Sequence, residues 1–93
     1  MVGKKASANS KRLARLIYDE ADKQGLRGNR SVPKERYWVQ GLCMCDSTKC
    51  PAVLTESLFY DSKSDLAILK SAEGKAKLVR LHVEGIIKYV EGL

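Results

Sequence analysis

The stretch DLAILKSAEGKAKLVRLHVEGIIKYV, residues 65–90, decides how the rest of the chain folds. Its apolar residues recur at steps of three and four, which places them on one face of a helix. A helix from Ser64 to about Glu91 would be about 42 Å long at ~1.5 Å per residue, longer than a small domain is wide. The rest of the chain must then cover an apolar stripe made of Leu66, Leu69, Ala72, Ala76, Val79, Val83, Ile86, Ile87 and Val90, widened by Ile68, Leu78 and Leu81.

The same stretch also fits a β-hairpin, with Glu73 and Gly74 in the turn between residues 66–68 and residues 79–83. Gly74 and Gly85 each cost a helix about 1 kcal/mol relative to alanine, which favours this alternative. The three-and-four spacing, however, extends over the whole stretch, whereas strict alternation is limited to residues 77–83. We therefore expect a helix, with a kink or break allowed at Gly74.

Length and composition predict a small, mainly α, single-domain helical bundle organised on this long C-terminal helix. A chain of 93 residues, 44% of them hydrophobic, can bury one modest core. The alternative is an α+β fold, in which an N-terminal helix packs on a small antiparallel meander. Residues 1–9 contain no periodic apolar set, so we expect a flexible basic arm there and a single domain over residues 10–93.

A second amphipathic helix is predicted from residue 10 to residue 24. Asn9 or Ser10 would cap its start, and Gly25 would end it. Its expected buried stripe consists of Leu13, Leu16, Ile17 and Ala21, with Tyr18 at the edge.

The sequence leaves the secondary structure in the middle of the chain open. Residues 34–42 fit either a short helix after Pro33 or a strand, because aromatic and β-branched residues favour strands. Pro51 could open a further helix as far as Tyr60, and Ser64 would then cap the long helix.

The net charge of +6 lies entirely in residues 1–36, which contain ten Lys and Arg against four Asp and Glu, while residues 37–93 are balanced. Such an asymmetry is typical of proteins with a polyanionic partner. We therefore expect a small, basic, non-enzymatic regulatory protein that binds nucleic acid, DNA or RNA, by its phosphates. The predicted nucleic-acid-binding residues are Lys4, Lys5, Lys11, Arg12, Arg15, Arg27, Arg30, Lys34 and Arg36.

The alternative function is a protein-interaction module, such as an adaptor or a virus-type inhibitor. Its basic face would bind an acidic protein surface, and part of the long helix's wide apolar stripe would remain for a partner or for a homodimer.

The densest chemical signal is a run of three cysteines, Cys43, Cys45 and Cys50. Zinc takes four ligands, mostly from cysteine and histidine, so these three with His82 form a tentative alternative zinc set. The spacing departs from the usual pairs of ligands, so we expect packed thiols and no cofactor, with redox sensing or a labile disulfide as a further alternative. An odd number of cysteines is also a poor disulfide framework, so we expect an intracellular protein, cytoplasmic or in the nucleoid or nucleus. No apolar run reaches the ~18 residues of a membrane span.

Around these cysteines, Lys34–Tyr37, Cys45–Cys50 and Thr55–Ser57 resemble the second half of the zinc motif in the Ogr/Delta family of phage late-transcription activators. The family's first cysteine pair has no counterpart here. We draw no function from this resemblance.

Residues for catalysis are scarce. His82 is the only histidine, and it has no serine or cysteine beside it in the sequence that would suggest an activated nucleophile, unless folding brings one close. No glycine-rich phosphate loop opens a helix after a strand. The sequence therefore predicts a protein that is not an enzyme.

Overall fold

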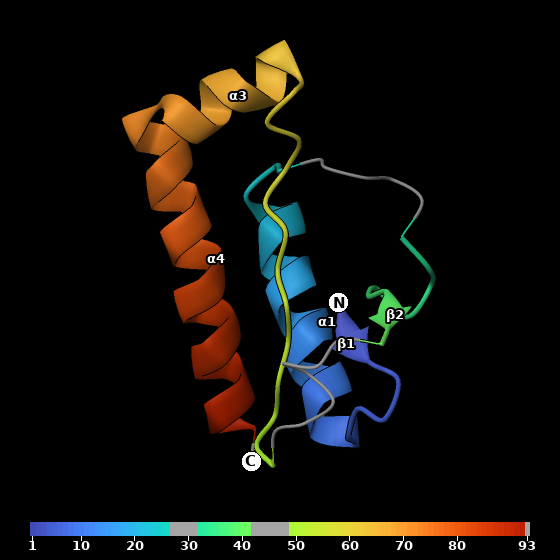
Figure 1. Ribbon diagram of the computed structural model, residues 1–93. Helices are drawn as coiled ribbons and strands as arrows, with labels where there is room; N and C mark the ends of the chain where they lie inside the picture. Colours follow the sequence, from blue (N-terminus) through green and yellow to red (C-terminus); the bar gives the residue numbers. More distant parts are fainter. Residues whose placement is uncertain (27–31, 42–48, 93) are drawn as a thin grey trace.

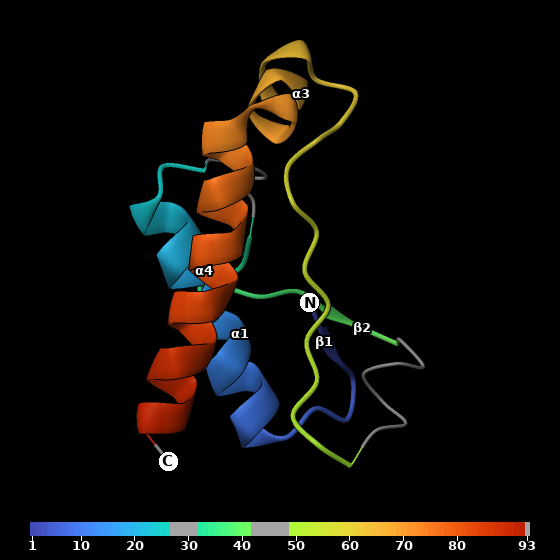
Figure 2. The ribbon, with the colours of Figure 1, turned by 90° about the vertical axis from the view of Figure 1, so that its left-hand side faces the viewer.

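The computed structural model describes residues 1–26, 32–41 and 49–92, and within these ranges it is mainly α, as predicted (Figure 1). The long helix α4 lies beside α1, and the shorter α3 crosses the end of α4 at the top of both views (Figures 1 and 2). The meander alternative is wrong, because residues 65–83 are helical apart from one break. The elements are β1 (Val2–Gly3), α1 (Ala8–Lys23), β2 (Val39–Gln40), α3 (Lys63–Lys70) and α4 (Ala72–Glu91).

The predicted long helix is divided at Ser71, whose backbone is extended at φ −77° and ψ 150°. The Ser71 hydroxyl accepts a hydrogen bond from the Gly74 amide at 2.9 Å and donates one to the Ile68 carbonyl at 2.9 Å, so one side chain caps both helices. A Cβ at Gly74 would lie 1.8 Å from the Ile68 carbonyl oxygen. The break thus falls three residues before the predicted position, and Gly74 is what allows so tight a corner.

Caps set the other helix ends. Ser7 caps α1, two or three residues before the predicted caps Asn9 and Ser10, and its hydroxyl accepts from the Ser10 amide at 3.1 Å. Gly25 follows the end of α1 with φ +74°, the left-handed conformation expected for a residue that ends a helix. Ser62, rather than the predicted Ser64, caps α3.

The core lies between α1 and α4, where Ile17, Leu26 and Leu81 are buried together. A Cβ at Gly85 would lie 2.8 Å from the Ile17 Cγ1 and 3.0 Å from its Cα. The two helices therefore approach most closely where α4 has no side chain. Partly buried apolar residues surround this centre: Leu13, Ala21, Leu58, Ile68 and Leu78.

The buried face of α4 differs from the stripe that the sequence predicted. Leu81, Gly85 and Tyr89 face α1, while the predicted members Val79, Val83, Ile86, Ile87 and Val90 are 42–63% exposed. The prediction was wrong because α4 has apolar residues on two faces. The face that packs against α1 is the one that contains Gly85, and the predicted stripe lies mainly on the other. On α1, Glu20 and Ala14 are buried beside Ile17. No helix in the described ranges has the length and hydropathy needed to cross a membrane.

Residues 1–3 pack on the domain, unlike the flexible arm expected for residues 1–9. Val2 has no exposed surface, and β1 pairs in parallel with β2, with Val2 opposite Val39. The Met1 ammonium group donates to the Leu54 carbonyl at 2.6 Å, and the Leu54 amide donates to the Met1 carbonyl at 3.0 Å.

Two further expectations concern the middle of the chain. Of the two readings of residues 34–42, the strand is the one that forms, as β2, after a turn at residues 34–37; residue 42 lies outside the described ranges. The helix predicted to begin at Pro51 is absent, because residues 51–57 are extended and run alongside α1 (Figures 1 and 2).

Candidate functional site

A cleft of about 460 Å³ lies against the core between α1, α4, the turn before β2 and the extended segment 51–59. Ile17, Leu81 and Leu54 contribute apolar walls, while Trp38 and Tyr37 contribute aromatic ones. Trp38 is 37% exposed, so the only tryptophan of the chain lines the cleft rather than the core, where such residues are more often found.

The polar part of the cleft centres on His82 and Thr55. His82 Nδ1 lies 2.6 Å from the Leu78 carbonyl oxygen, which can only accept, so Nδ1 carries the proton and donates. His82 Nε2 lies 3.0 Å from the Thr55 hydroxyl oxygen. In the neutral imidazole Nε2 has a lone pair, so Thr55 donates to it. The cleft thus contains a hydroxyl hydrogen-bonded to an imidazole whose tautomer is fixed.

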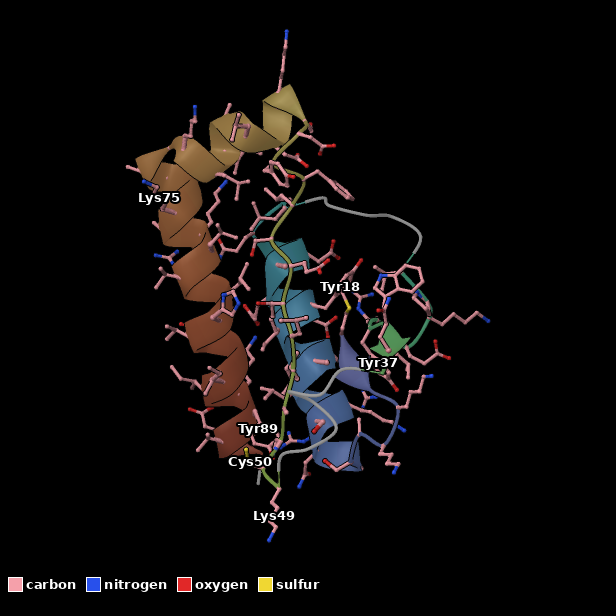
Figure 3. All side chains as sticks on the ribbon, in the orientation of Figure 1. Tyr18, Tyr37, Lys49, Cys50, Lys75 and Tyr89 are labelled. Atoms are coloured by element: carbon pink, nitrogen blue, oxygen red, sulfur yellow. The ribbon has the colours of Figure 1, made fainter. Side chains whose placement is uncertain are left out.

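A cation at the cleft wall is held by α1. The Arg36 guanidinium stacks over the Tyr18 ring at 4.8 Å and forms ion pairs with Asp19 at 2.5 Å and Asp22 at 3.4 Å. Arg36 and Leu58 have φ values of +69° and +64°, and both line the cleft. Figure 3 shows Tyr18 and Tyr37 on the side of α1 that carries β1 and β2.

An ion pair joins the C-terminal part of α1, through the buried Glu20, to the C-terminal part of α4, through Lys88. Glu20 is only 5% exposed, and its Oε1 accepts from Lys88 and, at 3.2 Å, from Lys23. The hydrogen bond from Lys88 holds the pKa of Glu20 below its ordinary value, against the opposing effect of burial, and the same bond raises the pKa of Lys88.

The basic residues predicted to contact phosphates do not form one free surface. The Arg12 guanidinium donates to the Tyr89 carbonyl at 2.8 Å and lies 4.4 Å from its ring centre, so Arg12 serves the C-terminal end of α4. The Arg36 guanidinium is paired with Asp19 and Asp22 of α1. Of the others, Lys4, Lys5, Arg15 and Lys34 are exposed, Lys11 is half-buried, and Arg27 and Arg30 lie outside the described residues.

The tentative zinc set does not assemble in the part of the chain that the structure describes. Cys43 and Cys45 lie outside that part. Cys50 is exposed, and Figure 3 shows it at the end of the molecule where α4 ends, whereas His82 is in the middle of α4. Among the described residues, no three His, Cys, Asp or Glu side chains converge as metal ligands.

Comparison with known proteins identifies a family of hydrolases. A family model for N-acetylmuramoyl-L-alanine amidase, Amidase_3, matches residues 1–88. This chain therefore belongs to the N-acetylmuramoyl-L-alanine amidase family. No curated protein matches it, and no solved structure does.

The family corrects the functional predictions made from the sequence. A non-enzymatic nucleic-acid-binding regulator and a protein-interaction module are both wrong, because the match over nearly the whole chain is to an enzyme family. The partner is corrected in the same way, since this family acts on peptidoglycan, a cell-wall polymer, rather than on DNA or RNA. The excess of basic residues was misread because it indicates only the sign of the charge on a partner and not the class of that partner. Two of the basic residues, Arg12 and Arg36, also form contacts within the chain.

Amidases of this family are often zinc-dependent. Zinc sites in hydrolases use three protein ligands from His, Glu, Asp or Cys. The described residues do not provide such a set, and His82 directs both ring nitrogens at the protein. The residues that the structure describes therefore do not fit a zinc ion.

The pair of Thr55 and His82 was missed by sequence reasoning, which looked for a nucleophile beside the histidine. The two residues are 27 positions apart. The only signal was that His82 lies one helical turn from Leu78, which gives Nδ1 a backbone acceptor and leaves Nε2 to face a neighbouring segment.

Proposed function

We propose that this chain acts as an amidase that hydrolyses the bond between N-acetylmuramic acid and L-alanine in peptidoglycan, with the cleft as its substrate site. The single observation that supports this most strongly is the family match over residues 1–88. The cleft supports it independently, because its volume of about 460 Å³ falls in the range of about 300–1,000 Å³ typical of small-molecule sites.

The chemistry of the cleft walls suits a substrate with a sugar at one end and a peptide at the other. The flat, weakly polar face of a sugar ring packs well on an aromatic side chain, and Trp38 offers such a surface while remaining 37% exposed. The scissile amide lies between the sugar's lactyl group and alanine, so it would reach the polar pair of Thr55 and His82 in the same cleft.

The test is hydrolysis of N-acetylmuramoyl-L-alanyl-D-isoglutamine by the purified chain, followed by mass spectrometry of the released dipeptide. The assay is run as purified, with added zinc, and with a chelator. The N-acetylmuramoyl-D-alanyl isomer is the substrate control, and we expect it to be cleaved far more slowly. Absence of hydrolysis under all three conditions would refute the proposal.

A pair of aromatic variants locates the substrate. Trp38→Ala should raise KM, because Trp38 lines the cleft. Tyr60→Ala removes an aromatic side chain that is 80% exposed and does not line the cleft, so its KM should stay at the wild-type value. Equal effects of the two changes would place the substrate elsewhere.

A further inference from the structure

Aromatic side chains line the cleft from two separate parts of the fold. Tyr37 and Trp38 come from the chain just before β2, and Phe59 comes from the end of the extended segment 51–59, where the chain turns toward α3. Figures 1 and 2 show β2 beside the middle of α1, whereas the connection into α3 lies beyond the C-terminal end of α1. The cleft therefore has aromatic walls at two levels along α1, and Trp38 belongs to only one of them.

Each aromatic wall directly follows a residue with positive φ. Arg36, at φ +69°, precedes Tyr37, and Leu58, at φ +64°, precedes Phe59. In the described ranges of the chain, no other residue except a glycine has a positive φ. Such conformations cost free energy and persist only where the surrounding structure holds them, which is common at ligand sites. The two strained residues thus set the direction in which the chain brings aromatic side chains to the cleft.

Contacts with neighbouring elements hold both of these turns in place. The Arg36 guanidinium pairs with Asp19 of α1. The Phe59 amide donates to the Asp65 carboxylate at 3.0 Å, and the Phe59 carbonyl accepts from the Ser62 amide at 3.0 Å. The aromatic side chains therefore stand on a fixed backbone, and a ligand that binds them loses less free energy to the ordering of the protein.

The exposure of these rings is not explained by packing in the core. Phe59 is 47% exposed and Trp38 is 37% exposed, so each ring leaves much of its apolar surface in contact with water. A ligand that covered this surface would gain the free energy that the fold leaves unused. Because both rings line one cleft, the same ligand can cover both.

The cleft also contains polar side chains that have no partner within the described part of the chain. Gln40, Glu56 and Ser57 line it and are exposed, and none of these side chains forms a hydrogen bond or ion pair with another described residue. Their amide, carboxylate and hydroxyl groups together supply donors and acceptors for the hydroxyl groups of a sugar. Aromatic walls with a few free polar groups beside them suit carbohydrate rings, which have weakly polar faces and polar edges.

We propose that Phe59 forms a second sugar subsite, so that the cleft binds two successive rings of a glycan strand rather than one muramic acid residue. This inference rests on the proposed amidase function for the identity of the first ring, which packs on Trp38. The N-acetylglucosamine ring that precedes muramic acid in the strand packs on Phe59. The preferred substrate class is therefore a peptide-bearing glycan of at least two sugars, and muramoyl peptides with a single sugar bind more weakly.

Binding of two sugars that carry no peptide tests the subsite without hydrolysis. N-acetylglucosamine has one ring and N,N′-diacetylchitobiose has two, and neither contains the lactyl amide that the proposed amidase cleaves. Trp38 is the only tryptophan of the chain, so a change in tryptophan fluorescence reports binding in the cleft. We expect the disaccharide to bind about two- to tenfold more tightly than the monosaccharide, the gain typical of one further aromatic contact.

Variants of Phe59 in the full chain test whether this residue provides the gain, with circular dichroism as a check that each variant folds. Phe59→Ala should abolish the preference for the disaccharide and leave the Kd of the monosaccharide unchanged. Phe59→Tyr keeps an aromatic face and should keep the preference. Tyr60→Ala is the matched control, because Tyr60 adjoins Phe59 but does not line the cleft, and both Kd values should stay at those of the wild type.

Hydrolysis provides a second readout. The KM for the disaccharide substrate N-acetylglucosaminyl-N-acetylmuramoyl-L-alanyl-D-isoglutamine should be about two- to tenfold lower than the KM for the same dipeptide on N-acetylmuramic acid alone. Phe59→Ala should raise KM for the disaccharide substrate only and leave kcat unchanged for both, because the second ring lies away from the scissile amide.

The outcomes separate this inference from the proposed function. If the wild type binds neither sugar, binds both with the same Kd, or keeps its preference in Phe59→Ala, the second subsite is wrong, and cleavage of a muramoyl amide would still establish the amidase function. If the preference for the disaccharide depends on Phe59 but no muramoyl amide is cleaved, the subsite is established and the amidase function is wrong.

Discussion

Replacing Gly85 by alanine tests the closest contact between α1 and α4. At an unconstrained helix position this change stabilises by about 1 kcal/mol, because alanine has the higher helix propensity. At Gly85 the new Cβ would lie 2.8 Å from Ile17 Cγ1, 3.0 Å from its Cα and 3.2 Å from its amide nitrogen. Two of these three atoms belong to the backbone, so a side-chain rotation cannot relieve the contact, and α1 and α4 must separate.

The two effects oppose each other, and overpacking is the larger. Inserting a methyl group into a well-packed core costs about 1–3 kcal/mol, and a contact with backbone belongs at the upper end of that range. After the gain in propensity is subtracted, we expect Gly85→Ala to lower the free energy of unfolding by about 1–2 kcal/mol. For a chain of this size, each kcal/mol corresponds to a fall in Tm of about 4–8 °C.

Urea unfolding followed by circular dichroism measures the change, and the control lies on the same helix. Ala76→Gly reverses the substitution on the exposed face of α4 and should cost only the propensity difference of about 1 kcal/mol. If Gly85→Ala raised Tm as an unconstrained helix position does, the two helices would not meet at this residue, and the buried face assigned to α4 would be wrong.

Two further perturbations test the corner and the ion pair. Gly74→Ala places a Cβ 1.8 Å from the Ile68 carbonyl oxygen, so we expect α3 to leave its position on α4; backbone amide NMR should show changes concentrated in α3, and changes spread evenly over the chain would contradict this. Because Lys88 lowers the pKa of Glu20, the stability that Glu20 contributes is complete above the unfolded pKa and is lost as pH falls through the folded pKa. The difference in unfolding free energy between wild type and Glu20→Gln, measured by urea titration, should therefore be constant above about pH 5 and shrink as pH falls below about 4. A difference that does not change between about pH 3 and 7 would exclude this role for Glu20.

The helices were predictable from the sequence, and the buried face of α4 was not. Spacing of apolar residues locates a helix, and residues 65–90 carry enough of them to make the prediction robust. When a helix is apolar on two faces, however, periodicity alone cannot say which one is buried. The deciding residue is Gly85, which counted against the helix in the sequence but marks its closest approach to α1 in the structure.

The candidate site was harder to predict because it depends on contacts between distant residues. His82 appeared isolated, since its partner Thr55 comes from an extended segment where the sequence predicted a helix after Pro51. The basic excess misled for a related reason. Formal charge is counted along the chain, but Arg12 and Arg36 are committed to partners within the fold, and only the structure shows this.

The core and the candidate site share α4, so their responses to mutation should be linked. His82 lies three residues before Gly85, less than one helical turn away, while Thr55 is fixed through Leu54 to Met1. A methyl group at Gly85 that moves α4 away from α1 therefore changes the distance between His82 Nε2 and Thr55 Oγ1. A small displacement is enough to matter, because a misplacement of about 1 Å can cost about a hundredfold in rate. Gly85→Ala should thus lower kcat by much more than the fraction of unfolded protein explains. Ala76→Gly, which alters stability on the far face of α4, should lower activity only in proportion to the unfolded fraction.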